Sequence, residues 1–145
     1  MKNQPIFSWD AETGVASCIL DSNAGVFVGT AKCHPDDVDM QSEKTGCEIA
    51  YRRAYINMLR HYRDNEIKPA LAALKQLYYT MNRSKRFNEK SYENVMLQRQ
   101  IRLKELDLDT TREMLATKEE SLRSLITEKE KFYQRIRKNR KANTQ

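Results

Sequence analysis

The densest group of side chains that could do chemistry lies within seven residues and comprises Cys33, His34, Asp36, Asp37 and Asp39. Thiolate, imidazole and carboxylate groups all bind metals, but zinc ligands usually come as two closely spaced pairs, and no second pair exists among the other cysteines and histidine. The aspartates also lack the glycine and distal glutamate of a calcium loop. We therefore interpret the segment as a turn stiffened by Pro35, followed by side chains that cap a helix, and expect no metal and no other cofactor.

Catalytic signatures are missing as well. The chain has no glycine-rich phosphate loop, no nucleophile elbow and no helical histidine pair, because its two histidines are 27 positions apart. Ser17 or Ser42 could be combined with His34 and an aspartate on paper, yet geometry rather than residue identity defines a catalytic triad. We expect that the protein is not an enzyme.

Two clusters of cations are better candidates for function. The first surrounds Phe132 and Tyr133 and carries a net charge of +6 over thirteen residues, with the cations Lys129, Lys131, Arg135, Arg137, Lys138, Arg140 and Lys141. The second comprises Arg83, Lys85 and Arg86. Spaced cations on a helix can follow phosphates or dock on an acidic protein, whereas a purely structural interpretation is that they favour solubility and complement the helix dipole.

The distribution of glycine indicates which elements must position these clusters. All four glycines lie within the first 46 residues, and from Cys47 onward only Pro69 is a strong helix breaker. Through Gly46 the chain has three Lys and seven Asp or Glu, a net charge of −4, whereas the remainder carries +10. This pattern predicts an acidic head with β-structure, followed by a basic helical stalk.

The head, residues 1–41, contains three β-prone runs at 6–9, 15–20 and 26–31. Each of the two intervening loops ends in a glycine that can adopt a positive φ, so we predict an antiparallel three-stranded meander. One face of such a sheet needs a cover, and the helix that follows supplies the available apolar surface.

The stalk is predicted as two long helices. Residues 42–82 form the first, with an apolar stripe at Ile67, Leu71, Leu74, Tyr78 and Met81. Pro69 either kinks this helix or begins a second one after a cap at Asp64 or Asn65, and we favour the kink. A basic bend at 83–90, a second helix at 91–139 capped by Asn88 or Ser91, and a disordered basic tail at 140–145 complete an α+β fold with an antiparallel, coiled-coil-like helical hairpin.

The seam of the second helix is only partly apolar. Leucine or isoleucine recurs at sevens at 101, 108, 115 and 122, but the companion positions three residues later are Lys104, Thr111, Lys118 and Leu125. We expect the first helix to fold back on the second. We also expect two chains to form a homodimer along five apolar residues that lie off the main stripe: Leu103, Leu106, Met114, Ile126 and Tyr133.

A short motif carries a resemblance. The segments 29–37, 42–46 and 49–54, which lie within a stretch of about 25 residues, resemble a pattern in small uncharacterised proteins encoded by phages and prophages of Gram-positive bacteria. The resemblance implies an accessory phage protein, a class that includes inhibitors of host enzymes and anti-CRISPR-like inhibitors of bacterial defence systems. It implies no catalytic residue.

These observations lead to three functional hypotheses. The first is a non-enzymatic phage-type protein that binds and modulates a host protein or protein–nucleic acid complex; the second is a sequence-nonspecific nucleic-acid-binding protein. The third is a binder of a small anion near Lys32, Arg52 and Arg53. Without a signal peptide or an apolar membrane span, and with an odd number of cysteines, three, the chain is expected in the cytoplasm of a bacterial host cell, with no membrane partner.

Overall fold

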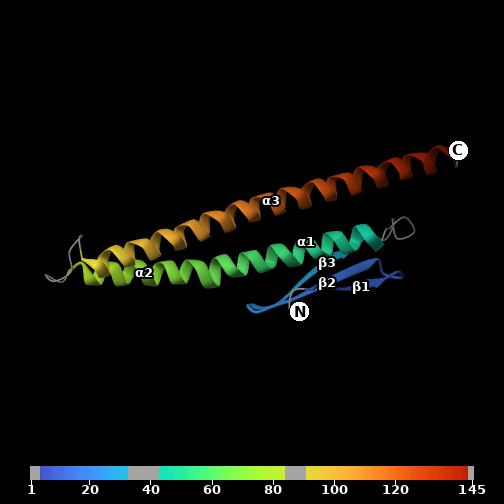
Figure 1. The fold of residues 1–145 in the computed structure, drawn as a ribbon. Coiled ribbons are helices and arrows are strands. Elements are labelled where there is room, and N and C mark those ends of the chain that lie inside the picture. Colours follow the sequence, from blue (N-terminus) through green and yellow to red (C-terminus); the bar gives the residue numbers. More distant parts are fainter. Residues whose placement is uncertain (1–3, 33–42, 84–90, 144–145) are drawn as a thin grey trace. The chain divides into compact units, whose positions relative to one another are not determined.

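The fold is α+β, with a three-stranded antiparallel sheet followed by helices (Figure 1). A computed structural model describes residues 4–32, 43–83 and 91–143. The elements are, in chain order, β1 (Ile6–Asp10), β2 (Val15–Ser22), β3 (Gly25–Lys32), α1 (Glu43–His61), the π-helical segment η2 (Tyr62–Ile67), α2 (Lys68–Met81) and α3 (Tyr92–Asn143). The chain divides into two compact units, one made of Met1–Met58 and Ala116–Gln145, the other of Leu59–Leu115.

The meander predicted for the head is confirmed, because the strand order is β1-β2-β3 and both pairings are antiparallel. Gly14 and Gly25 close the two turns with positive φ angles of 71° and 137°. In the first turn the Asp10 carboxylate accepts hydrogen bonds from the backbone N–H groups of Glu12 and Thr13, at 2.9 and 3.4 Å. These bonds lower the pKa of the exposed Asp10 carboxyl below its ordinary value.

The helix α1 covers one face of the sheet, as predicted (Figure 1). Ala16, Cys18, Leu20 and Ala31 from the sheet are buried with Ile49, Ala50 and Ala54 from the helix. Gly29 makes the close approach possible, because a Cβ atom there would lie 2.1 Å from the Ala50 carbonyl oxygen. The helix backbone therefore rests directly on β3.

In the same unit, α1 also packs against the C-terminal half of α3. Leu122, Leu125 and Ile126 contact the buried cluster of the sheet and α1. Two polar contacts join the helices: the Arg52 guanidinium donates a hydrogen bond to the Ser121 hydroxyl, and the Lys118 ammonium lies 5.1 Å from the centre of the Tyr55 ring. Lys118 is one of the companion positions that the heptad pattern left polar, and its charge is placed over an aromatic face.

In the other unit, α2 and the N-terminal half of α3 pack in antiparallel order. Ile67, Leu71 and Leu108 form a buried cluster, which confirms part of the apolar stripe predicted for the first helix. Farther along α2, Lys75 pairs with Glu105 at 3.6 Å and the Tyr78 hydroxyl accepts a hydrogen bond from Gln98 at 3.2 Å. Residues later in α2 thus contact residues earlier in α3.

A polar network around the buried Asn94 side chain lies where α2 ends and α3 begins. The Asn94 side chain is fully buried, its oxygen accepts a 2.8 Å hydrogen bond from Gln98, and its amide donates to Asn82 at 3.5 Å. Ser91 caps α3, since its hydroxyl oxygen accepts a hydrogen bond from the Asn94 N–H at 3.3 Å, so the cap predicted at this position is confirmed. A buried polar side chain with specific partners, such as Asn94, favours one register of the two helices over its neighbours.

The chain is helical on both sides of Pro69, but the π-helical turn η2 just before it was not predicted from the sequence. His61, Ile67 and Lys68 all have right-handed helical backbone angles, and no side chain caps a new helix at the starts of η2 and α2. The Lys68 N–H bonds to the Arg63 carbonyl, five residues back rather than four. This wider turn relieves the crowding that a proline ring causes against the carbonyl four residues before it.

The end of the chain differs from the prediction. The helix α3 continues to Asn143, so Arg140 and Lys141 are helical, in place of the disordered tail expected from residue 140. Alanine, lysine and arginine favour helix, and no glycine or proline ends it. Of the predicted bend at 83–90, only Arg83 is among the described residues, and the end of the predicted head, 33–41, lies outside them.

Candidate partner-binding surfaces

The cysteine, histidine and aspartate segment at 33–39 lies outside the described residues. Within residues 4–32, 43–83 and 91–143, no group of three or more histidine, cysteine or acidic side chains is placed to hold a metal ion. Cys18 and Cys47 carry free thiols. Burial raises the pKa of both thiols, which favours the protonated, unreactive form.

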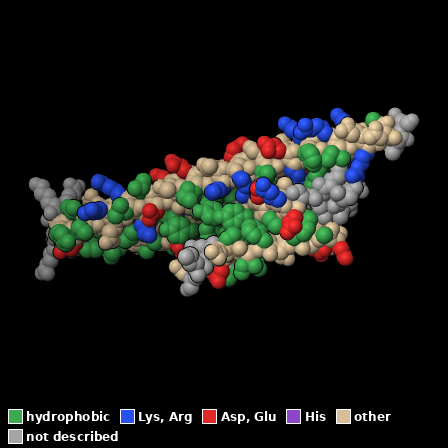
Figure 2. Space-filling model, turned by 45° about the vertical axis from the view of Figure 1, so that its right-hand side comes forward, with side chains coloured by type: hydrophobic (Ala, Val, Ile, Leu, Met, Phe, Trp, Pro, Cys, Tyr) green, Lys and Arg blue, Asp and Glu red, His purple; other side chains and the backbone are tan. Residues whose placement is uncertain are grey.

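The basic segment of α3 is an exposed helical surface. Lys131, Arg135, Lys138, Arg140 and Lys141 are exposed, whereas Lys129 and Arg137 are half-buried. Figure 2 shows Lys and Arg side chains gathered toward the C-terminal end of the chain. The Lys129 ammonium lies 5.6 Å from the centre of the Tyr133 ring, and the centres of the Phe132 and Tyr133 rings are 6.0 Å apart.

At the predicted bend, the structure describes one of the three cations proposed as a binding cluster. The Arg83 guanidinium lies 5.6 Å from the centre of the exposed Tyr79 ring. Lys85 and Arg86 lie outside the described residues.

The five residues of the predicted apolar seam separate into two groups. Leu103, Leu106 and Met114 are exposed, as the prediction requires. Ile126 packs against the core of the sheet and α1, and Tyr133 is only 3% exposed, so the prediction that these two face water is wrong. For Ile126 the physical reason is that α3 passes beside α1 in that unit and uses this apolar position within the chain.

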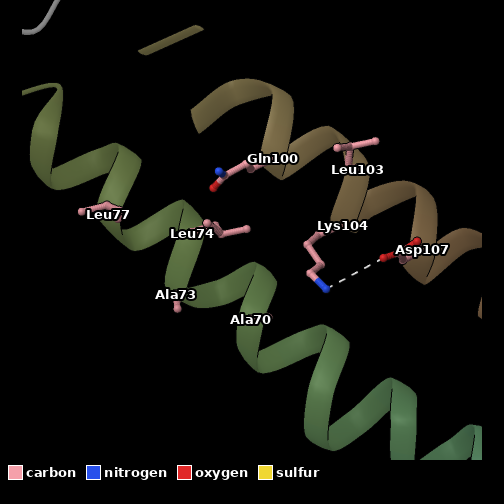
Figure 3. Close-up of a pocket in the computed structure, with 8 residues that line it drawn as sticks. All are labelled: Ala70, Ala73, Leu74, Leu77, Gln100, Leu103, Lys104 and Asp107. Atoms are coloured by element: carbon pink, nitrogen blue, oxygen red, sulfur yellow. Dashed lines mark ion pairs between the residues drawn. The ribbon is translucent and has the colours of Figure 1, made fainter. Parts of the chain in front are cut away.

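An open groove between α2 and α3 places Leu103, one of the three exposed seam residues, next to residues of the other helix. It has a volume of about 650 Å³ and is lined by Ala70, Ala73, Leu74, Leu77, Gln100, Leu103, Lys104 and Asp107. Leu74 and Lys104 extend into the space between the two helices, and Lys104 forms an ion pair with Asp107 at 3.9 Å (Figure 3). The groove thus has an apolar α2 side and a more polar α3 side.

The side chains on the two helices account for this groove. Ala70 and Ala73 are small, so the α2 surface is hollowed beside Leu74 and Leu77. Leu77 and Leu103 remain 49% and 54% exposed in spite of their size. Sequence reasoning singled out Leu103 because it lies off the heptad stripe, but it gave no signal for the α2 side, which depends on how the two helices align.

The cations proposed to hold a small anion make other contacts. The Arg53 guanidinium donates to the Thr30 carbonyl at 2.7 Å, and Arg52 donates to Ser121. Both arginines therefore join α1 to neighbouring elements of its own unit. Lys32 lies at the exposed end of β3.

Comparisons with protein-family models, with curated proteins and with solved structures give no match for this chain. Among the described residues, no helix is both long enough and apolar enough to span a bilayer.

Proposed function

We propose that the protein is a non-enzymatic binding protein that holds an amphipathic helix of a partner protein in the groove between α2 and α3. The observation that carries this proposal is the exposure of Leu77 and Leu103 at a groove with an apolar wall. Full burial of an exposed leucine side chain is worth about 1.5–3 kcal/mol, and because each of these leucines is half exposed, a partner that covers both gains about 1.5–3 kcal/mol in total from them. A helix that presents apolar residues at steps of three and four fits such a groove.

The polar residues beside the groove supply orientation. The Lys104 ammonium and the Asp107 carboxylate lie on the α3 side, next to the Gln100 amide. They offer one cation, one anion and an uncharged polar group within about two helical turns. A partner helix with charges of matching sign beside its apolar row would bind in one direction in preference to the other.

The role that follows is that of an accessory protein. In this proposal, two helices in a coiled-coil-like hairpin present the groove, and the partner is a host protein or defence complex in the cytoplasm of a bacterial cell. Binding inhibits or redirects that partner. The short resemblance to phage and prophage proteins agrees with this role.

Affinity capture from a bacterial lysate, with nuclease treatment and quantitative mass spectrometry, tests the proposal. A protein retained by the wild type should be lost by at least about tenfold with Leu77→Glu and with Leu103→Glu, because each places a charge where apolar surface must be buried. The matched control is Leu106→Glu, because Leu106 is an exposed leucine of α3, like Leu103, but does not line the groove. If both groove variants retain the partner as well as wild type, the proposal is wrong.

A second candidate function is sequence-nonspecific binding of nucleic acid by the end of α3. The observation that favours it is the run of five exposed cations on a continuous helix, from Lys131 to Lys141. Each phosphate contact releases counterions, so the affinity would fall steeply as salt rises. Reversal of Arg135, Arg137 and Lys138 to glutamate should then abolish retention of DNA and RNA in a gel, and unchanged retention would exclude this function.

A further inference from the structure

The two edges of the three-stranded sheet, β1 and β3, differ in whether their outward backbone groups have partners. At the β3 edge, the Arg53 guanidinium donates to the Thr30 carbonyl at 2.7 Å and the Asn57 amide donates to the Val28 carbonyl at 3.0 Å. Side chains of α1 therefore occupy two of the acceptors that an added strand would need there. This edge is thereby blocked in part, which disfavours further pairing there.

The same contacts fix which backbone groups of β1 point outward. Because the Val28 and Thr30 carbonyls point away from β2, the residues opposite them, Ile19 and Ser17, direct their N–H and C=O groups toward β1. Their partners there are Ile6 and Ser8. The alternation along an antiparallel strand then leaves the backbone groups of Phe7 and Trp9 at the outer side of β1, where no described element pairs with them.

We propose that the β1 edge is the interface with a second copy of this chain, with β1 paired antiparallel to β1 of that copy about a two-fold axis at Ser8. In this register Phe7 lies opposite Trp9 of the second copy, and both have outward backbone groups, so they form hydrogen-bonded pairs. Ser8 lies opposite Ser8 of the second copy. The two sheets become one sheet of six strands.

Self-complementarity is the reason to choose a second copy as the occupant. Phe7 is 47% exposed on the face that α1 covers, and its ring centre lies 6.3 Å from that of Tyr51. Pairing brings the indole of Trp9 from the second copy beside it, and aromatic cross-strand pairs are favourable. The small Ser8 side chain permits close approach at the axis, where the opposed Cα atoms of a non-hydrogen-bonded pair lie about 4.5 Å apart.

The outer face of the sheet gains from the same pairing. Ile6, Ile19 and Val28 lie directly opposite one another across the three strands and are 62%, 38% and 49% exposed. Each copy contributes one such row to the joined sheet. Because the contact is the same patch on both chains, it closes at a dimer and leaves only the blocked β3 edges.

Sedimentation of full-length variants tests the interface. The wild type should sediment as a dimer, and Ser8→Lys should convert it to a monomer at the same concentration, since two like charges would be opposed at the axis. Thr30→Lys is the matched control, with the same charge on the same face at the blocked edge, and it should remain dimeric. A monomeric wild type, or a Ser8→Lys protein as dimeric as Thr30→Lys, would overturn the proposal.

A second variant keeps the test decisive if the lysine variant does not fold. Under mild oxidation, Ser8→Cys should give a disulfide-linked dimer joined through the introduced thiols, because paired Cα atoms at the axis are within the range that a disulfide spans. Thr30→Cys should not be linked in this way. Equal cross-linking of the two variants, or none with Ser8→Cys, would overturn the proposal.

Discussion

At the scale of single residues, Asp64 has an unusual environment. Its carboxylate accepts two hydrogen bonds from Arg63, at 2.8 and 3.1 Å, and lies 3.3 Å from the Lys68 ammonium. The hydrogen bonds from Arg63 lower the pKa of Asp64 from 3.8 to about 2. The two cations come from positions within and just after the π-helical turn, so the carboxylate connects the turn to the start of α2.

This environment predicts a pH dependence. Because the pKa of Asp64 is lower in the folded chain than in the unfolded chain, its ionised form stabilises the fold at every pH above about 4. That contribution is lost as the pH falls toward 2. An NMR titration should find the Asp64 midpoint clearly below 3.8, the ordinary value of this carboxyl, and Asp64→Asn should reduce the acid dependence of unfolding between pH 4 and 2. A normal midpoint would contradict the account.

Asn94 is a second residue whose environment gives a prediction. Its side chain is fully buried and bonded to Gln98 and Asn82, so Asn94→Ala removes both hydrogen bonds. We expect a loss of about 1–3 kcal/mol in the free energy of unfolding, measured by urea denaturation. Asn139→Ala, at an exposed position of the same helix, is the control and should change stability by less than about 0.5 kcal/mol. Equal effects of the two changes would show that the network does not matter.

At the scale of elements, the sequence was most informative where the pattern is local. The alternation in the head and the glycines at turns were sufficient to predict β1, β2 and β3 and the helix that covers them. The π-helical turn was not predictable, because Pro69 is compatible with a kink, with a new helix or with a wider turn, and the choice depends on backbone hydrogen bonding.

The contact between sheet and helix gives the clearest element-level prediction. A methyl group in Gly29→Ala would lie 2.1 Å from the Ala50 carbonyl oxygen and 2.4 Å from the Ala54 nitrogen, so α1 must move away from β3. Because backbone atoms cannot turn aside as side chains do, we expect a cost near the upper end of the overpacking range, about 3 kcal/mol. Thermal unfolding should show the loss in Gly29→Ala and little change in Thr30→Ala, and similar melting temperatures for the two would contradict it.

The seam of α3 shows why the boundaries of an element were easier to predict than the residues that its side chains contact. Lys104, Thr111 and Lys118 weaken the heptad pattern, yet Thr111 is buried, Lys104 lines the groove and Lys118 lies over Tyr55. Polar side chains at inward positions have partners that only the aligned helices can supply. For the same reason, the burial of Ile126 and Tyr133 could not be read from their position off the main stripe.

At the scale of the whole molecule, charge and apolar surface suggest different partners. The chain carries a net charge of +6, and α3 ends in a basic segment that could attract any polyanion. The α2–α3 groove, in contrast, needs an apolar surface of defined shape. The charge distribution could be read from the sequence, and the α+β fold class was predictable from the glycine positions and apolar patterns. The groove was not predictable, because it depends on how small residues of α2 align with α3.

The two kinds of binding respond differently to salt, so the salt dependence of affinity is the most direct test of the central claim. Titration calorimetry should measure the captured partner, free of nucleic acid, against the wild-type protein at 50 and 200 mM salt. An apolar anchor predicts that the dissociation constant changes by less than about tenfold, whereas six to ten phosphate contacts would weaken binding by about 10³–10⁵. A loss of that size, or binding that requires nucleic acid, would contradict recognition through the groove.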